Sequence, residues 1–395
     1  MPWEDHTVLE QRFRFMDDWN SGAWNLAELC RFYGVSRQTG YKWIGRYESD
    51  GVEGLWDLSR APHEHPNAIG EEIEDLVIRT RREHGLWGAR KIHAWLEREY
   101  GCKVVPARST VGAILSRNGL TVARKRLRTS RPASTPLSHA DGPNRVWCVD
   151  FKGWFRTGDG RRMDPLTITD AYSRFLLRCQ ALKGETYEYC KPVMEATFRE
   201  YGLPEGMRSD NGAPFGSNGE SGLTGLSVWW IRLGVRPERI EPGKPQQNGR
   251  HERMHLTLKQ ATAMPAAGNW RQQQKRFDAF REEYNEIRPH EALGQVAPRK
   301  YYQPSVRVYP ERLPEVSYEG DWQVRRVTAG GQIRWRGESV FVSHALAGEM
   351  VGLEQEEEEQ WRVWFSFYEV GLLDGRSGKV WNLREWKKRH RPKAQ

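Results

Sequence analysis

The chain has 395 residues, of which 38% are hydrophobic and 29% are charged. This length exceeds one typical domain, and the composition supports packed cores and excludes a wholly disordered chain. No apolar run reaches the roughly 18 residues of a membrane-spanning helix, and the acidic N-terminus is not typical of a secretory signal. The five cysteines include no Cys-x-x-Cys pair, which argues against a disulfide framework or a cysteine-rich zinc module. The net charge of +9 favours a polyanionic partner.

The first 60 residues predict a helix-turn-helix unit. Asn25 is the expected N-cap of one helix, and Ser36 is the expected N-cap of a second helix that runs from residue 37 to about residue 47. The second helix carries donors suited to base edges and phosphates: Arg37, Gln38, Tyr41, Lys42 and Arg46. The alternative is a helical hairpin with a solvated basic face.

Residues 69–120 show three helical patterns and predict a second unit of the same kind. Three residues suited to DNA contact begin its third helix: Arg108, Ser109 and Thr110. A purely structural three-helix unit is the alternative interpretation of this region.

Residues 121–142 are rich in Pro, Ser and Thr and predict a linker. Its basic residues are suited to following a phosphate backbone: Arg124, Lys125, Arg126 and Arg128. A merely solvated tether is the alternative.

From residue 143 to residue 305 the pattern changes to short apolar strands followed by helices, which predicts a mixed α/β sheet domain. Residues 318–372 return to short strands separated by glycines and predict a small β-barrel. Residues 373–395 are expected to be a basic tail. The chain is therefore multidomain, with all-α units, an α/β core and a β domain.

Three acids occur where carboxylates are unusual. Asp150 lies inside the apolar run WCVDF, where an unpaired carboxylate would be costly. Asp210 ends a strand in RSDNG, and Glu252 lies on the helix that follows KPQQNG. Carboxylate oxygens suit Mg²⁺, and two such ions support phosphoryl displacement without a nucleophilic side chain. Taken singly, an Asx-turn at Asp210 and a solvated Glu252 are the ordinary interpretations.

These motifs, together with ITDAYSR, the pair Tyr284-Asn285 and RPHEAL, resemble the integrase core of bacterial insertion-sequence transposases, which are related to retroviral integrases. The resemblance covers about residues 144–305. It implies a ribonuclease-H-like fold and an Asp-Asp-Glu triad of Asp150, Asp210 and Glu252 that holds two Mg²⁺ or Mn²⁺ ions. The interval between the last two acids is longer than is common in the family, and the Gly-rich loop 215–227 accounts for it. Glu220 in that loop is a weaker rival to Glu252.

Other residues near the triad have less specific patterns. Lys259 lies two helical turns after Glu252, where it is expected either to contact DNA or to be an exposed lysine. His251 and His255 are spaced like zinc ligands, but we interpret them as solvent or DNA contacts. Asp170 is expected to stabilise a turn.

The resemblance implies a DNA transposase in the bacterial cytoplasm, associated with the nucleoid. It would bind terminal inverted repeats, cleave the 3′ ends and transfer them into double-stranded target DNA. A homodimer or a higher oligomer with no membrane partner is expected. The alternatives are a domesticated DNA-binding protein without recombination activity and a nuclease of RNA–DNA hybrids.

Overall fold

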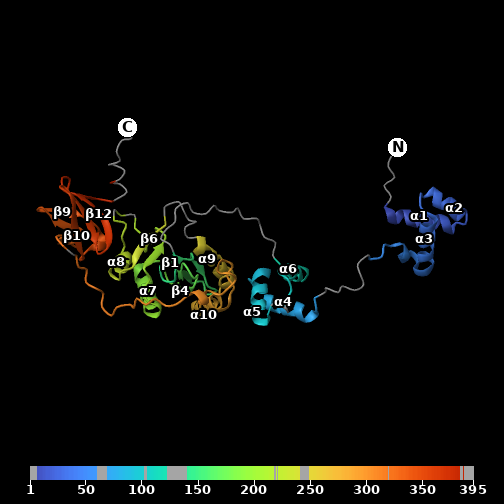
Figure 1. Cartoon of the computed structure of the whole chain (residues 1–395), viewed down its shortest axis with the longest axis horizontal. Helices are drawn as coiled ribbons and strands as arrows, with labels where there is room; N and C mark the ends of the chain where they lie inside the picture. The colour runs from blue at the N-terminus through green and yellow to red at the C-terminus, as the bar shows by residue number, and fades with distance from the viewer. Residues whose placement is uncertain are drawn as a thin grey trace, which may run out of the picture. The chain divides into compact units, whose positions relative to one another are not determined.

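The computed structural model describes residues 7–59, 69–101, 105–121, 140–217, 219, 221–240, 249–318, 320–382 and 386. The chain divides into two compact units, residues 1–69 and residues 70–395. Figure 1 labels their elements along the chain. Several predicted residues lie outside the described residues: Arg124, Lys125, Arg126, Arg128 and Glu220.

The first unit is helical, as expected. Its elements are α1 (Val8–Asn20), α2 (Leu26–Phe32), α3 (Arg37–Asp50) and the short 3-10 helix η1 (Gly51–Leu55). The Asn25 and Ser36 side chains accept hydrogen bonds from the Glu28 and Thr39 amides, which confirms both predicted caps. A Cβ atom at Gly40 would lie 2.6 Å from the Cys30 sulfur. Only glycine therefore permits this close approach of α2 to α3.

The second unit begins with the three predicted helices, α4 (Glu71–Glu83), α5 (Ala89–Tyr100) and α6 (Arg108–Arg117). Each helix buries apolar residues against the others, and Ile92 of α5 and Trp87, between α4 and α5, are inaccessible to solvent. Helical spacing of the apolar residues produces this small core.

A mixed six-stranded sheet forms the centre of the second unit. Its strands are β1 (Val146–Phe151), β2 (Phe155–Arg156), β3 (Arg162–Asp170), β4 (Leu176–Leu182), β5 (Gly206–Ser209) and β6 (Arg236–Arg239). The order is β2-β3-β1-β5-β6, and β4 pairs with β3. β1 is antiparallel to β3 but parallel to β5. This arrangement confirms the predicted α/β core.

Helices cover both faces of this sheet. They are α7 (Tyr187–Tyr201), α8 (Gly225–Arg232), α9 (Gly249–Thr262) and α10 (Trp270–Glu282). Leu177 belongs to the apolar cluster under α7 and α8, whereas Leu176 belongs to the cluster under α9 and α10. Neighbouring strand residues point to opposite faces, so the strands of a doubly covered sheet are nearly continuously apolar.

The C-terminal region is a separate antiparallel sheet. Its strands are β7 (Gln323–Arg326), β8 (Gln332–Trp335), β9 (Glu338–Phe341), β10 (Met350–Glu357), β11 (Gln360–Phe365), β12 (Tyr368–Asp374) and β13 (Lys379–Trp381). The order is β13-β12-β11-β10-β7, and the hairpin β8-β9 contacts both edge strands. Because β13 pairs with β12, the sheet extends past the predicted boundary at residue 372, into residues that were expected to belong to the tail. In the described part of the chain, no helix has the length and apolarity of a membrane span.

Candidate active site

Asp150 and Asp210 lie at the carboxyl ends of adjacent parallel strands. The pairs between β1 and β5 are Val146 with Gly206, Trp147 with Met207 and Cys148 with Arg208, a constant offset of 60 residues. Asp150 and Asp210 are separated by the same 60 positions, so continuing the register by two residues sets them side by side. Neighbouring strands lie about 4.8 Å apart. The last paired residues are Cys148 and Arg208, so each predicted aspartate follows its strand's last paired residue by two positions at the same edge of the sheet.

Helix α9 crosses the sheet next to this edge, held by two buried histidines. His251 and His255 are only 2% and 8% exposed. Both rings contact Thr167 of β3, which pairs with Asp150 of β1. Our interpretation of these histidines as solvent or DNA contacts is wrong. Their spacing of four residues puts them on the apolar face of α9 together with Met254.

The Thr167 hydroxyl determines the protonation of both imidazoles. It donates to the Asp150 carbonyl oxygen at 3.1 Å and lies 2.6 Å from Nε2 of His251 and 2.7 Å from Nε2 of His255. Because a hydroxyl has a single proton, both Nε2 atoms must donate to it. Nδ1 of His251 then accepts from the Thr169 hydroxyl at 3.1 Å. Nδ1 of His255 keeps its lone pair.

That lone pair faces the catalytic candidate Asp150. Nδ1 of His255 lies 4.0 Å from a carboxylate oxygen of Asp150. Ligand atoms of Asp150, His251 and His255 all lie within 4.8 Å of one another. With the tautomers above, only Nδ1 of His255 keeps a lone pair for a cation beside the Asp150 carboxylate, because both nitrogens of His251 are hydrogen-bonded. Sequence reasoning missed this juxtaposition, although the four-residue spacing was its signal.

Burial of the two histidines predicts a pH-dependent stability. Desolvation lowers the pKa of His251 to about 3 and that of His255 to about 2. Both rings stay neutral in the folded chain while the unfolded chain takes up protons below its pKa of about 6.5. Stability is therefore complete above pH 6.5 and decreases as the pH falls. We expect a loss of about 2 kcal/mol per histidine between pH 7 and pH 5.

Hydrogen exchange of the α9 amides in EDTA measures this loss within the core. The matched control is the double variant His251→Gln and His255→Gln, in which an amide nitrogen replaces each Nε2 donor without titrating. An equal pH dependence in the wild-type chain and this control would contradict the assignment.

Glu252 and Lys259 share the exposed face of α9. Glu252 does not join the close group around Asp150 among the described side chains. Lys259 lies near Lys152, whose pKa is lowered by burial and then by Lys259, while Asp150 opposes that shift. Lys152 therefore lies close enough to Lys259 and to Asp150 for both charges to act on it. Sequence reasoning missed Lys152, which follows Asp150 by two positions on the same strand edge.

A further acid lies near the second aspartate. The pKa of Glu185 is raised by partial burial and by the negative charges of Asp164 and Asp210. Asp164 itself is fully buried and accepts two hydrogen bonds from the Arg162 guanidinium. Of the two acids, Glu185 is exposed and Asp164 is buried, so Glu185 is the one that solvent can reach near Asp210. Glu185 does not belong to any motif recognised in the sequence.

Asp170 has the expected structural role. It is 1% exposed, and its carboxylate accepts hydrogen bonds from the Asn144 and Ser173 amides and from the Ser173 hydroxyl. These bonds hold the turn after β3.

The predicted DNA contacts of α3 lie on one solvent face. Arg37, Gln38, Tyr41 and Lys42 are exposed, as their helical spacing requires. Arg46 is half-buried and lies over the Trp43 ring, with its guanidinium carbon 5.1 Å from the ring centroid.

The predicted contacts of α6 lie in its first turn. Arg108 and Ser109 are exposed and Thr110 is half-buried. Both helices thus present polar side chains to solvent.

Protein-family models match five segments of the chain. A helix-turn-helix domain matches residues 11–63 and a homeodomain-like domain matches residues 39–115. Two integrase core domain models match residues 140–245 and 233–298. The C-terminal domain of the IS481 family transposases matches residues 322–380.

Curated relatives come from insertion elements. The chain is 28% identical over 250 residues to a protein of insertion element IS407 from Burkholderia multivorans, covering 60% of this chain and 82% of that protein. It is 24% identical over 265 residues to a protein of IS476 from Xanthomonas euvesicatoria, covering 62% of this chain and 70% of that protein.

Among solved structures, the magnesium complex of the HTLV-2 integrase catalytic core aligns with a TM-score of 0.33 at 15% identity, covering 42% of this chain and all of that one. The BIV integrase core aligns with a TM-score of 0.32 at 19% identity, covering 40% of this chain and 93% of that one.

Proposed function

Because the chain belongs to the insertion-sequence DDE transposases with an integrase core, we propose that it recombines the DNA of its own element. It binds the terminal inverted repeats, cleaves the 3′ ends and joins them to target DNA. The two helical units supply end recognition, and the α/β core supplies the chemistry.

The observation that carries this proposal is the 60-residue offset between β1 and β5, which equals the separation between Asp150 and Asp210. Acids at the ends of adjacent parallel strands are suited to hold divalent cations against a bound phosphate. Glu252 on α9, the helix fixed over β3 by its histidines, is the third proposed ligand. An exposed helical glutamate has the side-chain freedom to turn toward the two aspartates.

The donor set fits Mg²⁺ or Mn²⁺, and we expect two ions. When bound, they supply charge neutralisation and an activated oxygen for in-line displacement at phosphorus. Asp150, Asp210 and Glu252 would hold them, and Lys152 and Lys259 would attract the scissile phosphate. During cleavage a water oxygen bonds to phosphorus as the 3′ oxygen leaves and takes up a proton. During joining the freed 3′-hydroxyl loses its proton and its oxygen bonds to a phosphorus of the target DNA, as the 3′ oxygen of the target strand leaves and is protonated.

The test uses the full chain and duplexes that end in the inverted repeats flanking its gene. We expect 3′ nicking and joined products with Mg²⁺ or Mn²⁺, none with EDTA, and at least tenfold less product from scrambled ends. Because two ends are joined together, the active species should be a homodimer or larger. Specific binding without nicking or joining under either metal would instead support a domesticated DNA-binding protein.

A further inference from the structure

The motif RPHEALGQ belongs to a segment that the proposed chemistry does not use. We call residues 283–302 the strap. The Asn285 side chain accepts from the Leu176 amide at 2.8 Å and donates to the Leu176 carbonyl at 3.0 Å, which fixes one end of the strap to β4. At the other end, Tyr302 stacks on Phe175 with 4.3 Å between ring centroids. The strap is therefore rigidly attached to the catalytic sheet.

The helices α4 and α5 pack against this strap. The Lys91 amine at the start of α5 donates to the Pro289 carbonyl, and Arg90 forms an ion pair with Glu291. His84, between α4 and α5, lies 3.2 Å from a Glu283 carboxylate oxygen. Partial burial in this contact lowers the pKa of Lys91 to about 8.

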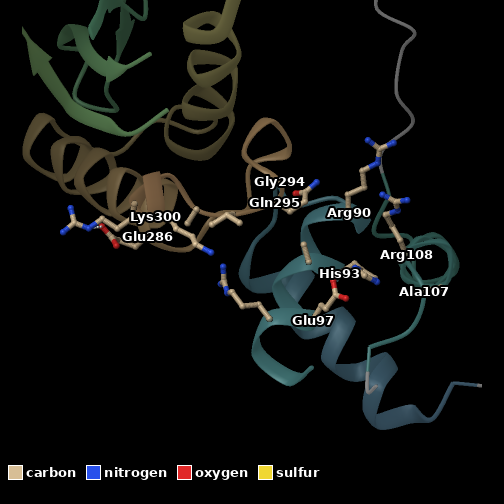
Figure 2. A pocket seen from close by; sticks show the side chains of 14 residues that line it. Arg90, His93, Glu97, Ala107, Arg108, Glu286, Gly294, Gln295 and Lys300 are labelled. Atoms are coloured by element: carbon tan, nitrogen blue, oxygen red, sulfur yellow. Dashed lines mark ion pairs between the residues drawn. The ribbon is translucent and has the colours of Figure 1, made fainter. Parts of the chain in front are cut away.

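A groove of about 1170 Å³ lies beside this contact. Figure 2 shows Arg90 and Arg108 on the helical side and Lys300 on the strap side. Five basic side chains line the groove, against two acidic ones, and the basic set is Arg90, Arg98, Arg108, Arg299 and Lys300. All five are exposed. Three of the five are in exposed ion pairs: Arg90 with Glu291, Arg98 with Glu99 and Arg299 with Glu286. Exposed pairs of this kind contribute little, so these arginines can exchange a carboxylate for a phosphate.

We propose that this groove binds the sugar-phosphate backbone of the duplex whose bases α6 contacts. This inference rests on the proposed function and adds to it a site on the catalytic core. Arg108 lines the groove and belongs to the first turn of α6. A duplex bound at that end of α6 would therefore pass between the helices on one side of the groove and the strap on the other. Arginine and lysine pair with phosphate without reading sequence. DNA in the groove would therefore contact both the recognition helix α6 and the strap, and the strap is hydrogen-bonded to the sheet that carries the predicted catalytic acids.

The strap arginine and lysine provide the test. The double variant Arg299→Ala and Lys300→Ala of the full chain is titrated with an inverted-repeat duplex and a scrambled duplex at several salt concentrations. Loss of two phosphate contacts should lower the slope of log K against log salt by about 1.8. If the affinity at 1 M salt is unchanged, this change in slope corresponds to about 60-fold weaker binding of the variant at 0.1 M salt. The weakening should be equal for both duplexes.

The matched control removes the same charge from α10, where Arg271 and Lys275 are exposed and lie outside the groove. Arg271→Ala with Lys275→Ala should change the slope by less than 0.5. Equal changes in the two double variants would overturn the groove assignment. A wild-type chain that fails to prefer the inverted repeat would instead contradict the proposed function.

Amine labelling of the wild-type chain gives an independent measurement. Lys300 should be labelled in the free protein and protected by duplex DNA, whereas Lys275 should stay reactive. Protection of Lys300 by an acidic polypeptide such as polyglutamate, but not by DNA, would also overturn the assignment.

Discussion

Replacing Asp150 by Asn should reduce joining of inverted-repeat ends by at least about 10³-fold, while affinity for the same ends changes less than twofold. Asparagine keeps the size of the side chain but loses the negative charge that holds a divalent cation. Asp210→Asn should behave in the same way, because both carboxylates lie at the ends of adjacent strands. Product formation on a labelled duplex and binding to it are measured in parallel at saturating Mg²⁺.

The control is Glu282→Gln, which removes one negative charge from an exposed position of α10. Its joining should stay within twofold of wild type. The third acid is tested by comparing Glu252→Gln with Glu185→Gln. We expect the first to abolish joining and the second to retain at least one tenth. The opposite result would identify Glu185, rather than Glu252, as the third metal ligand. Undiminished joining by Asp150→Asn would refute the metal site.

Thr167→Val should destabilise the α/β core by roughly 3–9 kcal/mol. Valine has the shape of threonine but removes the hydroxyl that serves His251, His255 and the Asp150 carbonyl. Each buried polar group that loses its partner costs about 1–3 kcal/mol. Hydrogen exchange of α9 and β3 amides reports this loss separately from the other domains.

Thr169→Val is the matched control, since its hydroxyl serves only His251 in this network. Its expected cost is about 1–2 kcal/mol. The argument requires a clearly larger loss for Thr167→Val. Equal losses would mean that the two imidazoles find other partners, and the tautomer assignment would then be wrong.

Local sequence rules identified most elements. Asn25 and Ser36 cap their helices as predicted, because a cap depends only on residues within one turn. Asp150 was recognised because an acid inside an apolar strand is unusual. The β domain was ended too early because β13 is a three-residue strand whose pairing with β12 no local pattern encodes.

The roles of the two histidines depend on long-range contacts. His251 and His255 meet Thr167 across 84 and 88 positions of chain, and an i, i+4 pair looks the same on a solvated face and on a buried one. The strap is a second example. The motif RPHEAL was recognised in the sequence, but its contacts with Arg90 and Lys91 of α5 are visible only in the structure.

The sequence by itself determined the order of helical, α/β and β regions and predicted the helices that would face DNA and the acids that would hold metal, because these follow from periodicity, capping and residue chemistry within short segments. Only the tertiary structure decided that His255 faces Asp150, that Lys152 lies near both that acid and Lys259, and that the strap and helices α5 and α6 line a groove with five basic side chains. Those contacts join residues far apart in the chain, and their energies depend on burial and distance, which a linear pattern does not contain.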